Sequence, residues 1–183
     1  GVEIVKFDPI RFPWINHFFS RDHRKIAVID GKSAYIGGIN IADYYVTGIK
    51  GIGEWRDMHS KVEGEAVNDL QRVFLDTWNK ETGQDINGEI YFPQQENKGN
   101  AYIAVIDRRP HETPERMRQA YANAIHSAKE SIVMVNPYFM PIPIIRKAIE
   151  KAIDDSVEVT IILSEKGDIP VVPDGVWRVG YKL

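Results

Sequence analysis

Two short apolar runs, residues 25–29 and 33–36, flank the tripeptide Asp30-Gly31-Lys32. Both central residues of a type I′ turn need a positive φ, and Asp-Gly is a pair that adopts it readily. The pattern therefore predicts a β-hairpin. Residues two apart on a strand share a face. Only side chains of the same face can therefore lie together at an end of the hairpin.

The rest of the chain changes between helix and strand patterns. Apolar residues at helical spacing predict helices over 65–80, with Gly83 just past its end, and over 141–155. A further helix is expected to open at Pro114, and a short one near Asn40, a good N-cap residue. Apolar runs and alternation predict further strands at 2–7, 56–63, 101–107, 131–136 and 157–163.

A polar stretch, residues 84–100, predicts a linker between two units, 1–83 and 101–183. In the second unit the order strand–helix–strand–helix–strand implies parallel strands joined by right-handed crossovers. The expected fold class is α/β, a mixed sheet flanked by helices. The chain starts at Gly1 and passes at once into a strand pattern, so we expect it to be a piece of a longer protein.

Composition excludes some classes of function. The chain has no cysteine, so neither disulfides nor a thiolate nucleophile or metal site is available. The net charge of −3 provides no broad positive field, so a nucleic-acid partner is disfavoured. No apolar run approaches the roughly 20 residues that cross a bilayer, and we expect the chain by itself to be soluble.

The strongest functional signal is a set of six residues at fixed spacing. They are His23, Lys25, Asp30, Gly37, Gly38 and Asn40. At roughly one in twenty for each fixed position, a chance match is on the order of 10⁻⁸ per starting residue. Taken one at a time, the same residues have ordinary structural explanations, such as a strand histidine, an edge lysine, a turn aspartate and a glycine bulge.

The residue types suit chemistry on a phosphodiester. His23 and Lys25 lie two residues apart on the expected strand, so their side chains would point the same way. The imidazole of His23 is a competent nucleophile near neutral pH. Lys25 and the Asn40 amide would supply positive charge and donors as charge develops on the phosphate oxygens. Gly37 and Gly38 would let the backbone approach the phosphate closely.

Two further interpretations concern residues near this set. Asp30 has the opposite strand parity from His23, so within the catalytic set we interpret it as a turn residue that supports the hairpin. The other histidines have no comparable neighbours and are interpreted as ordinary polar residues. They are His17, His59, His111 and His126.

The spacing resembles the signature of the phospholipase D superfamily, His-x-Lys-x4-Asp-x6-Gly-Gly/Ser-x-Asn. Four more segments look like the cardiolipin synthase branch, although an asparagine is more usual there than Asp8. They are Phe7–Pro13, Gly38–Tyr45, Glu54–His59 and Asn136–Pro141. The resemblance covers nearly the whole chain apart from the polar stretch.

This resemblance implies two repeated lobes, each with one signature. Residues 1–83 would be the C-terminal part of the first lobe, and 101–183 the N-terminal part of the second, lacking its signature. One histidine of the pair attacks phosphorus and forms a phosphohistidine, while the other protonates the leaving alcohol. His23 would be one of them, and Asp57, with Glu54 behind it, is the candidate carboxylate that orients the nucleophile.

The resemblance also implies a substrate and partners. The activity would be phosphatidyl transfer between phosphatidylglycerol molecules, at a bacterial membrane surface reached through the full-length parent, with neither a metal nor an organic cofactor. No second His-x-Lys-x4-Asp occurs in the 183 residues, so a complete site needs the rest of the parent or a homodimer.

Alternatives stay open at this point. They are a phospholipase D-type phosphodiesterase or nuclease with the same signature, and a non-catalytic module. A run of apolar residues ahead of His23 would face lipid in a phospholipid enzyme and would otherwise belong to the core. It comprises Phe12, Trp14, Ile15, Phe18 and Phe19.

Overall fold

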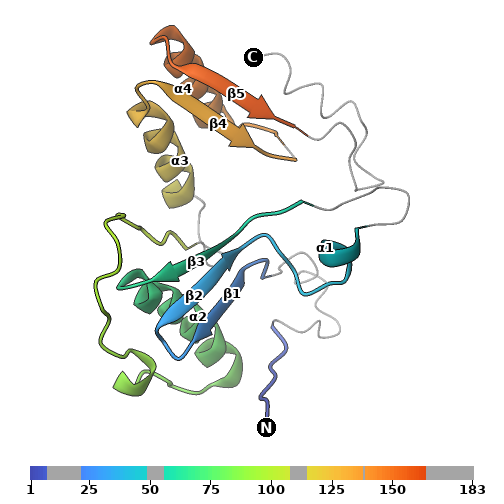
Figure 1. Ribbon diagram of the computed structural model, residues 1–183, viewed down its shortest axis with the longest axis vertical. Helices are drawn as coiled ribbons and strands as arrows, with labels where there is room; N and C mark the ends of the chain where they lie inside the picture. The colour runs from blue at the N-terminus through green and yellow to red at the C-terminus, as the bar shows by residue number, and fades with distance from the viewer. Residues whose placement is uncertain (8–21, 49–55, 108–114, 138, 164–183) are drawn as a thin grey trace. The chain divides into compact units, whose positions relative to one another are not determined.

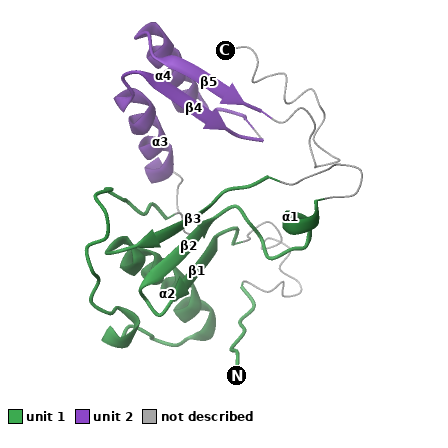
Figure 2. Ribbon diagram, viewed as in Figure 1, with its two compact units in different colours: residues 1–107 green, residues 108–183 purple. Residues whose placement is uncertain are grey.

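The computed structural model describes residues 1–7, 22–48, 56–107, 115–137 and 139–163. The chain divides into two compact units, residues 1–107 and residues 108–183 (Figure 2). The polar stretch expected to be a linker falls within the first unit, together with the segment that follows it.

The first unit is built on an antiparallel sheet with the strand order β1-β2-β3. Its strands are β1 (Lys25–Ile29), β2 (Ser33–Gly37) and β3 (His59–Glu63). Helix α2 (Ala66–Thr82) covers one face of this sheet (Figure 1). The buried centre between sheet and helix consists of Ala34, Val67 and Leu70, surrounded by Ile26, Val28, Ile36, Val62 and Val105.

The hairpin predicted from the sequence is confirmed. Asp30 and Gly31 have φ values of 54° and 64°, as a type I′ turn requires, and the Lys32 amide donates to the Ile29 carbonyl at 3.0 Å. A Cβ added to Gly31 would lie 2.6 Å from the ring of Pro93. The turn therefore needs glycine for its backbone conformation and for its packing.

Helix α2 and the polar stretch after it are tied together. The helix ends at Gly83, whose φ is 73° and whose amide donates to the Asn79 carbonyl at 2.8 Å, so the predicted C-terminal glycine is confirmed. The Asn79 side chain then exchanges two hydrogen bonds with the backbone of Ile86, both at 3.0 Å. A short 3₁₀ helix, η2 (Glu89–Tyr91), follows, and Gln95 donates to the Gly31 carbonyl at 2.7 Å.

Three local predictions were wrong. Residues 2–7 and 101–107 are not strands, and the N-cap of helix α1 (Tyr44–Thr47) is Asp43 rather than the expected Asn40. Alternation shows only that a segment suits a sheet, whereas a strand also needs a partner to bond its backbone. The side chain of Ile4 is 85% exposed, while the last part of 101–107 is held by side-chain contacts described below.

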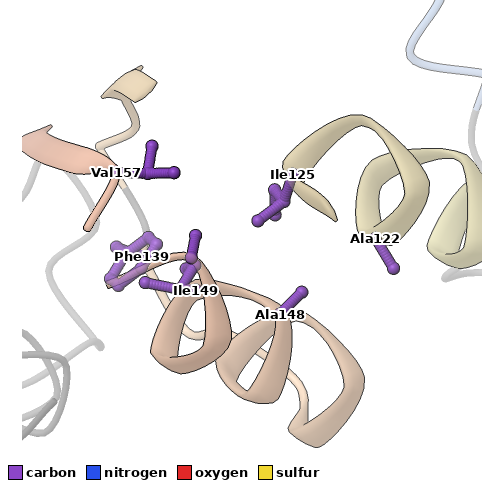
Figure 3. Close-up of a cluster of buried hydrophobic side chains, with 7 residues drawn as sticks. Ala122, Ile125, Phe139, Ala148, Ile149 and Val157 are labelled. Atoms are coloured by element: carbon purple, nitrogen blue, oxygen red, sulfur yellow. The ribbon is translucent and has the colours of Figure 1, made fainter. Parts of the chain in front are cut away.

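The second unit alternates as the sequence predicts. It contains α3 (Glu115–Ser127), β4 (Ser131–Val135), α4 (Pro143–Asp154) and β5 (Glu158–Ile162), and β4 pairs with β5 in parallel. Pro143 lies in the first turn of α4, where its missing N–H costs nothing. The core of the unit comprises Ala122, Ile125, Phe139, Ala148, Ile149, Ala152 and Val157 (Figure 3).

Together the units confirm the α/β class, with an antiparallel and a parallel sheet beside helices. Among the described helices, none combines the length and the apolar character that crossing a bilayer requires.

Candidate functional site

The pairing of the three strands gathers part of the signature on one face of the sheet. Lys25 of β1 lies opposite Gly37 of β2, and Gly37 lies opposite His59 of β3. The neighbouring row, Ile26 and Ile36, packs toward α2. Because successive side chains alternate, the row with Lys25 is on the face that α2 does not cover.

His23 is not on the strand where the sequence placed it. β1 begins at Lys25, and the exposed His23 lies in the segment that leads into it. The Lys25 ammonium donates to the His23 carbonyl oxygen at 2.6 Å. The two residues therefore stay together through this bond, whereas we predicted that a shared strand would align them.

Arg24, between the two, anchors this segment. Its guanidinium donates to both carboxylate oxygens of Asp22, at 2.9 and 2.7 Å, to the Asp107 carboxylate at 2.9 Å and to the Thr77 hydroxyl at 2.7 Å. Its backbone amide also donates to Asp22 at 2.9 Å. Arg24 thus ties the approach to β1 both to α2 and to the end of 101–107, and fixes the backbone that carries His23.

The charges of this cluster support one another. Partial burial raises the pKa of the Asp22 carboxyl, but the hydrogen bonds from Arg24 and its positive charge outweigh burial and hold this pKa below its ordinary value of 3.8. The same bonds, with the charge of Asp107, raise the pKa of Arg24 despite its partial burial. Ion pairing with Arg24 therefore stabilises the folded state while Asp22 is ionised.

We expect Arg24→Met to lower the free energy of unfolding by about 2 kcal/mol, because it removes several hydrogen bonds between charged groups. Because the pKa of Asp22 is lowered by folding, its contribution is present above pH 3.8 and is lost as the pH falls through the folded value. Urea denaturation at pH 7 and pH 3 would show the difference from wild type shrinking at the lower pH.

The matched control is Arg72→Met. Arg72 pairs with Asp69 at 2.8 Å on the exposed side of α2, and such a pair contributes about 0.5 kcal/mol or less. Equal losses for the two variants would contradict the anchoring role of Arg24.

The two glycines of the signature permit close packing by residues around the start of β3. A Cβ on Gly37 would lie 2.3 Å from the Met58 carbonyl oxygen, and one on Gly38 would lie 2.2 Å from Oδ1 of Asp57. The Gly38 amide donates to that Met58 carbonyl at 2.9 Å, and Asp57 accepts from the Met58 amide at 2.7 Å. We had predicted that the glycines leave room for a phosphate. The atoms that a Cβ at either position would meet are protein atoms. Asp57 is thereby brought against the signature.

Asn40 is held by a residue that the sequence analysis missed. Its Nδ2 donates to the Tyr45 hydroxyl at 3.0 Å, and this hydroxyl lies 3.2 Å from the Gly38 carbonyl, to which it donates. Tyr45 on α1 therefore closes the loop between Gly38 and Asn40. The sequence hinted at this contact only by placing Tyr45 five residues after Asn40, in an expected short helix that can bring its side chain back to the loop.

Asp30 lies at the other end of the hairpin. At about 3.3 Å per residue, it is roughly 16 Å along β1 from Lys25. The structure does not bring it to the other signature residues, and its position is that of a turn residue. Glu54 and the apolar residues 12–19 lie outside the described residues.

Two other features bear on the site. Among the residues that the structure describes, no three His, Asp or Glu side chains are grouped so that they could hold a metal ion. A pocket of about 310 Å³ is lined by Val5, Phe7, Asp22, Arg24, Ile26, Val73, Phe74, Thr77, Trp78 and Glu81. Because Arg24 and Ile26 have the opposite parity from Lys25, this pocket belongs to the α2 side of the sheet.

Comparison with known proteins finds cardiolipin synthases among the relatives of this chain. The chain is 38% identical to cardiolipin synthase 2 of Staphylococcus epidermidis over 175 residues, which is 94% of this chain and 36% of that protein. It is 39% identical to the cardiolipin synthase of Halalkalibacterium halodurans and 37% identical to that of Alkalihalophilus pseudofirmus, covering 35% of each. No family model and no solved structure matches the chain.

The chain therefore spans about a third of the length of these relatives. The match extends over nearly all of the chain and includes both units. With the signature between His23 and Asn40, the chain belongs to the cardiolipin synthase branch of the phospholipase D superfamily.

Proposed function

We propose that this chain is the first-signature segment of a phosphatidyltransferase that makes cardiolipin from two molecules of phosphatidylglycerol. The observation that carries the proposal is the contact of the Asp57 carboxylate with Gly38. It brings a carboxylate from outside the signature to the end of the sheet where Lys25 and Gly37 pair. The identity to cardiolipin synthases supports the choice of substrate.

In the proposed reaction a histidine nitrogen attacks the phosphorus of one phosphatidylglycerol. A P–N bond forms, the bond from phosphorus to the glycerol headgroup breaks, and the second histidine gives the leaving oxygen its proton. A hydroxyl of the second phosphatidylglycerol then attacks the phosphohistidine, its proton passes to the same second histidine, and the P–N bond breaks. The products are cardiolipin and glycerol, and no cofactor is consumed.

The residues of this chain take distinct roles in that reaction. His23 is one of the two histidines, and Asp57 orients an imidazole through a hydrogen bond. Lys25 and Asn40 donate to the non-bridging oxygens as negative charge develops on them. The hydroxyl of Tyr45 holds the Asn40 amide in place.

The second histidine must come from outside the 183 residues, since they contain one signature. The rest of a parent protein would supply it, or a second copy of the chain in a homodimer. The phospholipid substrate implies that the parent works at a bacterial membrane surface. A nuclease is less well supported, because a net charge of −3 does not favour a polyanion.

The test compares the parent protein with the 183-residue chain, each supplied with phosphatidylglycerol vesicles. We expect the parent to release cardiolipin and glycerol, and the chain as a monomer to give no turnover, because the leaving alkoxide has no positioned proton donor. Light scattering would establish the oligomeric state, and single-stranded DNA would serve as the competing substrate. Robust turnover by a monomeric chain would contradict the two-histidine mechanism, and cleavage of DNA without cardiolipin would favour the nuclease.

A further inference from the structure

His59 occupies a position that its sequence context did not reveal. It opens β3 directly opposite Gly37, which lies directly opposite Lys25 on the other side of β2. The three residues form one row on the face of the sheet that α2 leaves uncovered. The middle member has no side chain, so nothing from β2 stands between the side chains of Lys25 and His59.

The ring of His59 lies beside Gly37. A Cβ added to Gly37 would lie 2.7 Å from the Nδ1 atom of His59 and 2.6 Å from its Cα. The imidazole therefore occupies space next to Gly37 that a side chain on β2 would otherwise need.

Both flanking side chains have donors to offer. The Lys25 ammonium has three N–H groups and gives one to the His23 carbonyl. The His59 ring is exposed, and among the described residues no side-chain hydrogen bond or ion pair engages it. An imidazole carries at least one N–H, and a tetrahedral phosphate presents oxygens on several sides. One phosphoryl group above Gly37 can thus accept from Lys25 on one side and from His59 on the other.

We propose that His59 is a substrate-binding residue that donates a hydrogen bond to a non-bridging oxygen of the phosphodiester held by Lys25. The inference rests on the proposed function, since it places the reacting phosphate over this face of the sheet. It adds a donor from β3 to the donors that the signature itself supplies. It also gives Gly37 a second role, because any side chain there would displace the His59 ring.

The test titrates the 183-residue chain with inorganic phosphate and follows the imidazole signals by NMR, with assignments from single His→Ala variants. We expect the His23 and His59 signals to move together with one dissociation constant. His59→Ala should weaken that constant about tenfold, equivalent to about 1.4 kcal/mol. His59→Gln keeps an N–H donor and should restore most of the affinity, whereas a residue needed only for folding would not be rescued in this way.

The matched control is His126→Ala, on the exposed surface of α3 in the second unit, which should leave the constant unchanged. Thermal melting of each variant would show that the fold is retained. If phosphate shifts the NMR signal of His23 but not that of His59, the inference is overturned and the proposed function stands. If phosphate moves neither signal, the phosphate site itself fails, and both proposals fall with it.

Discussion

Replacing His23 with alanine in the parent protein is expected to abolish cardiolipin formation. Whichever histidine of the pair attacks phosphorus, the loss of one removes either the covalent intermediate or the proton donor. We expect turnover to fall on the order of 10⁴-fold or more, as it does when other enzymes lose a nucleophile. The measurement is the yield of cardiolipin from phosphatidylglycerol vesicles, with the acid-labile phosphohistidine trapped in parallel.

His23→Ala should leave the fold intact, because the side chain is exposed and lies outside β1. His126→Ala is the matched control and should retain full turnover. A His23→Ala variant within a few-fold of wild type would refute the assignment of the signature. A variant that loses activity only because it unfolds would favour a structural role for His23.

The second large effect concerns the two adjacent glycines, which should respond differently to the same substitution. A Cβ on Gly37 meets backbone, the Met58 carbonyl oxygen at 2.3 Å and the Cα of His59 at 2.6 Å, so β3 itself has to move. We expect Gly37→Ala to cost about 2–3 kcal/mol of stability, within the range of overpacking.

The three atoms nearest to a Cβ on Gly38 all belong to the Asp57 carboxylate, at 2.2–2.7 Å, and that side chain can rotate away. Gly38→Ala should therefore keep most of its stability and lose activity, on the order of 10²-fold for a misplaced catalytic group. Urea denaturation and cardiolipin yield measure the two effects separately.

Two further variants sharpen this comparison. Gly88→Ala introduces a Cβ whose nearest neighbour, the side chain of Ile90, is 3.8 Å away, so both stability and activity should remain at the level of wild type. In an Asp57→Ala background, Gly38→Ala should cause no additional loss, because the carboxylate that it displaces is already gone. Independent, additive losses would mean that Gly38 acts through something other than Asp57.

Several features of this protein could be predicted from short stretches of sequence. The turn at Asp30 and Gly31 follows from the φ preferences of two neighbouring residues, and the end of α2 at Gly83 follows from the same physics. The parallel pairing of β4 with β5 follows from the helix between them. The spacing of the signature pointed to phosphodiester chemistry before any geometry was known.

Other features depend on which distant segments meet. Residues 2–7 and 101–107 alternate like strands, yet a strand forms only where another backbone pairs with it. His23 was expected on β1, but the bonds of Arg24 to Thr77 and Asp107 set the path of the chain there instead. Neither contact could be predicted from the residues next to Arg24 in the sequence.

The sequence by itself determined the hairpin, helices α2 and α4 and the identity of the signature, because these depend on neighbouring residues and on residue chemistry. Only the tertiary structure decided that Asp57 lies against Gly38 and that the His59 ring lies beside Gly37. Both contacts require the register in which β2 pairs with β3, and a slip of one residue would turn His59 to the opposite face. That register is set by packing against α2 across segments far apart in the chain, which no local pattern encodes.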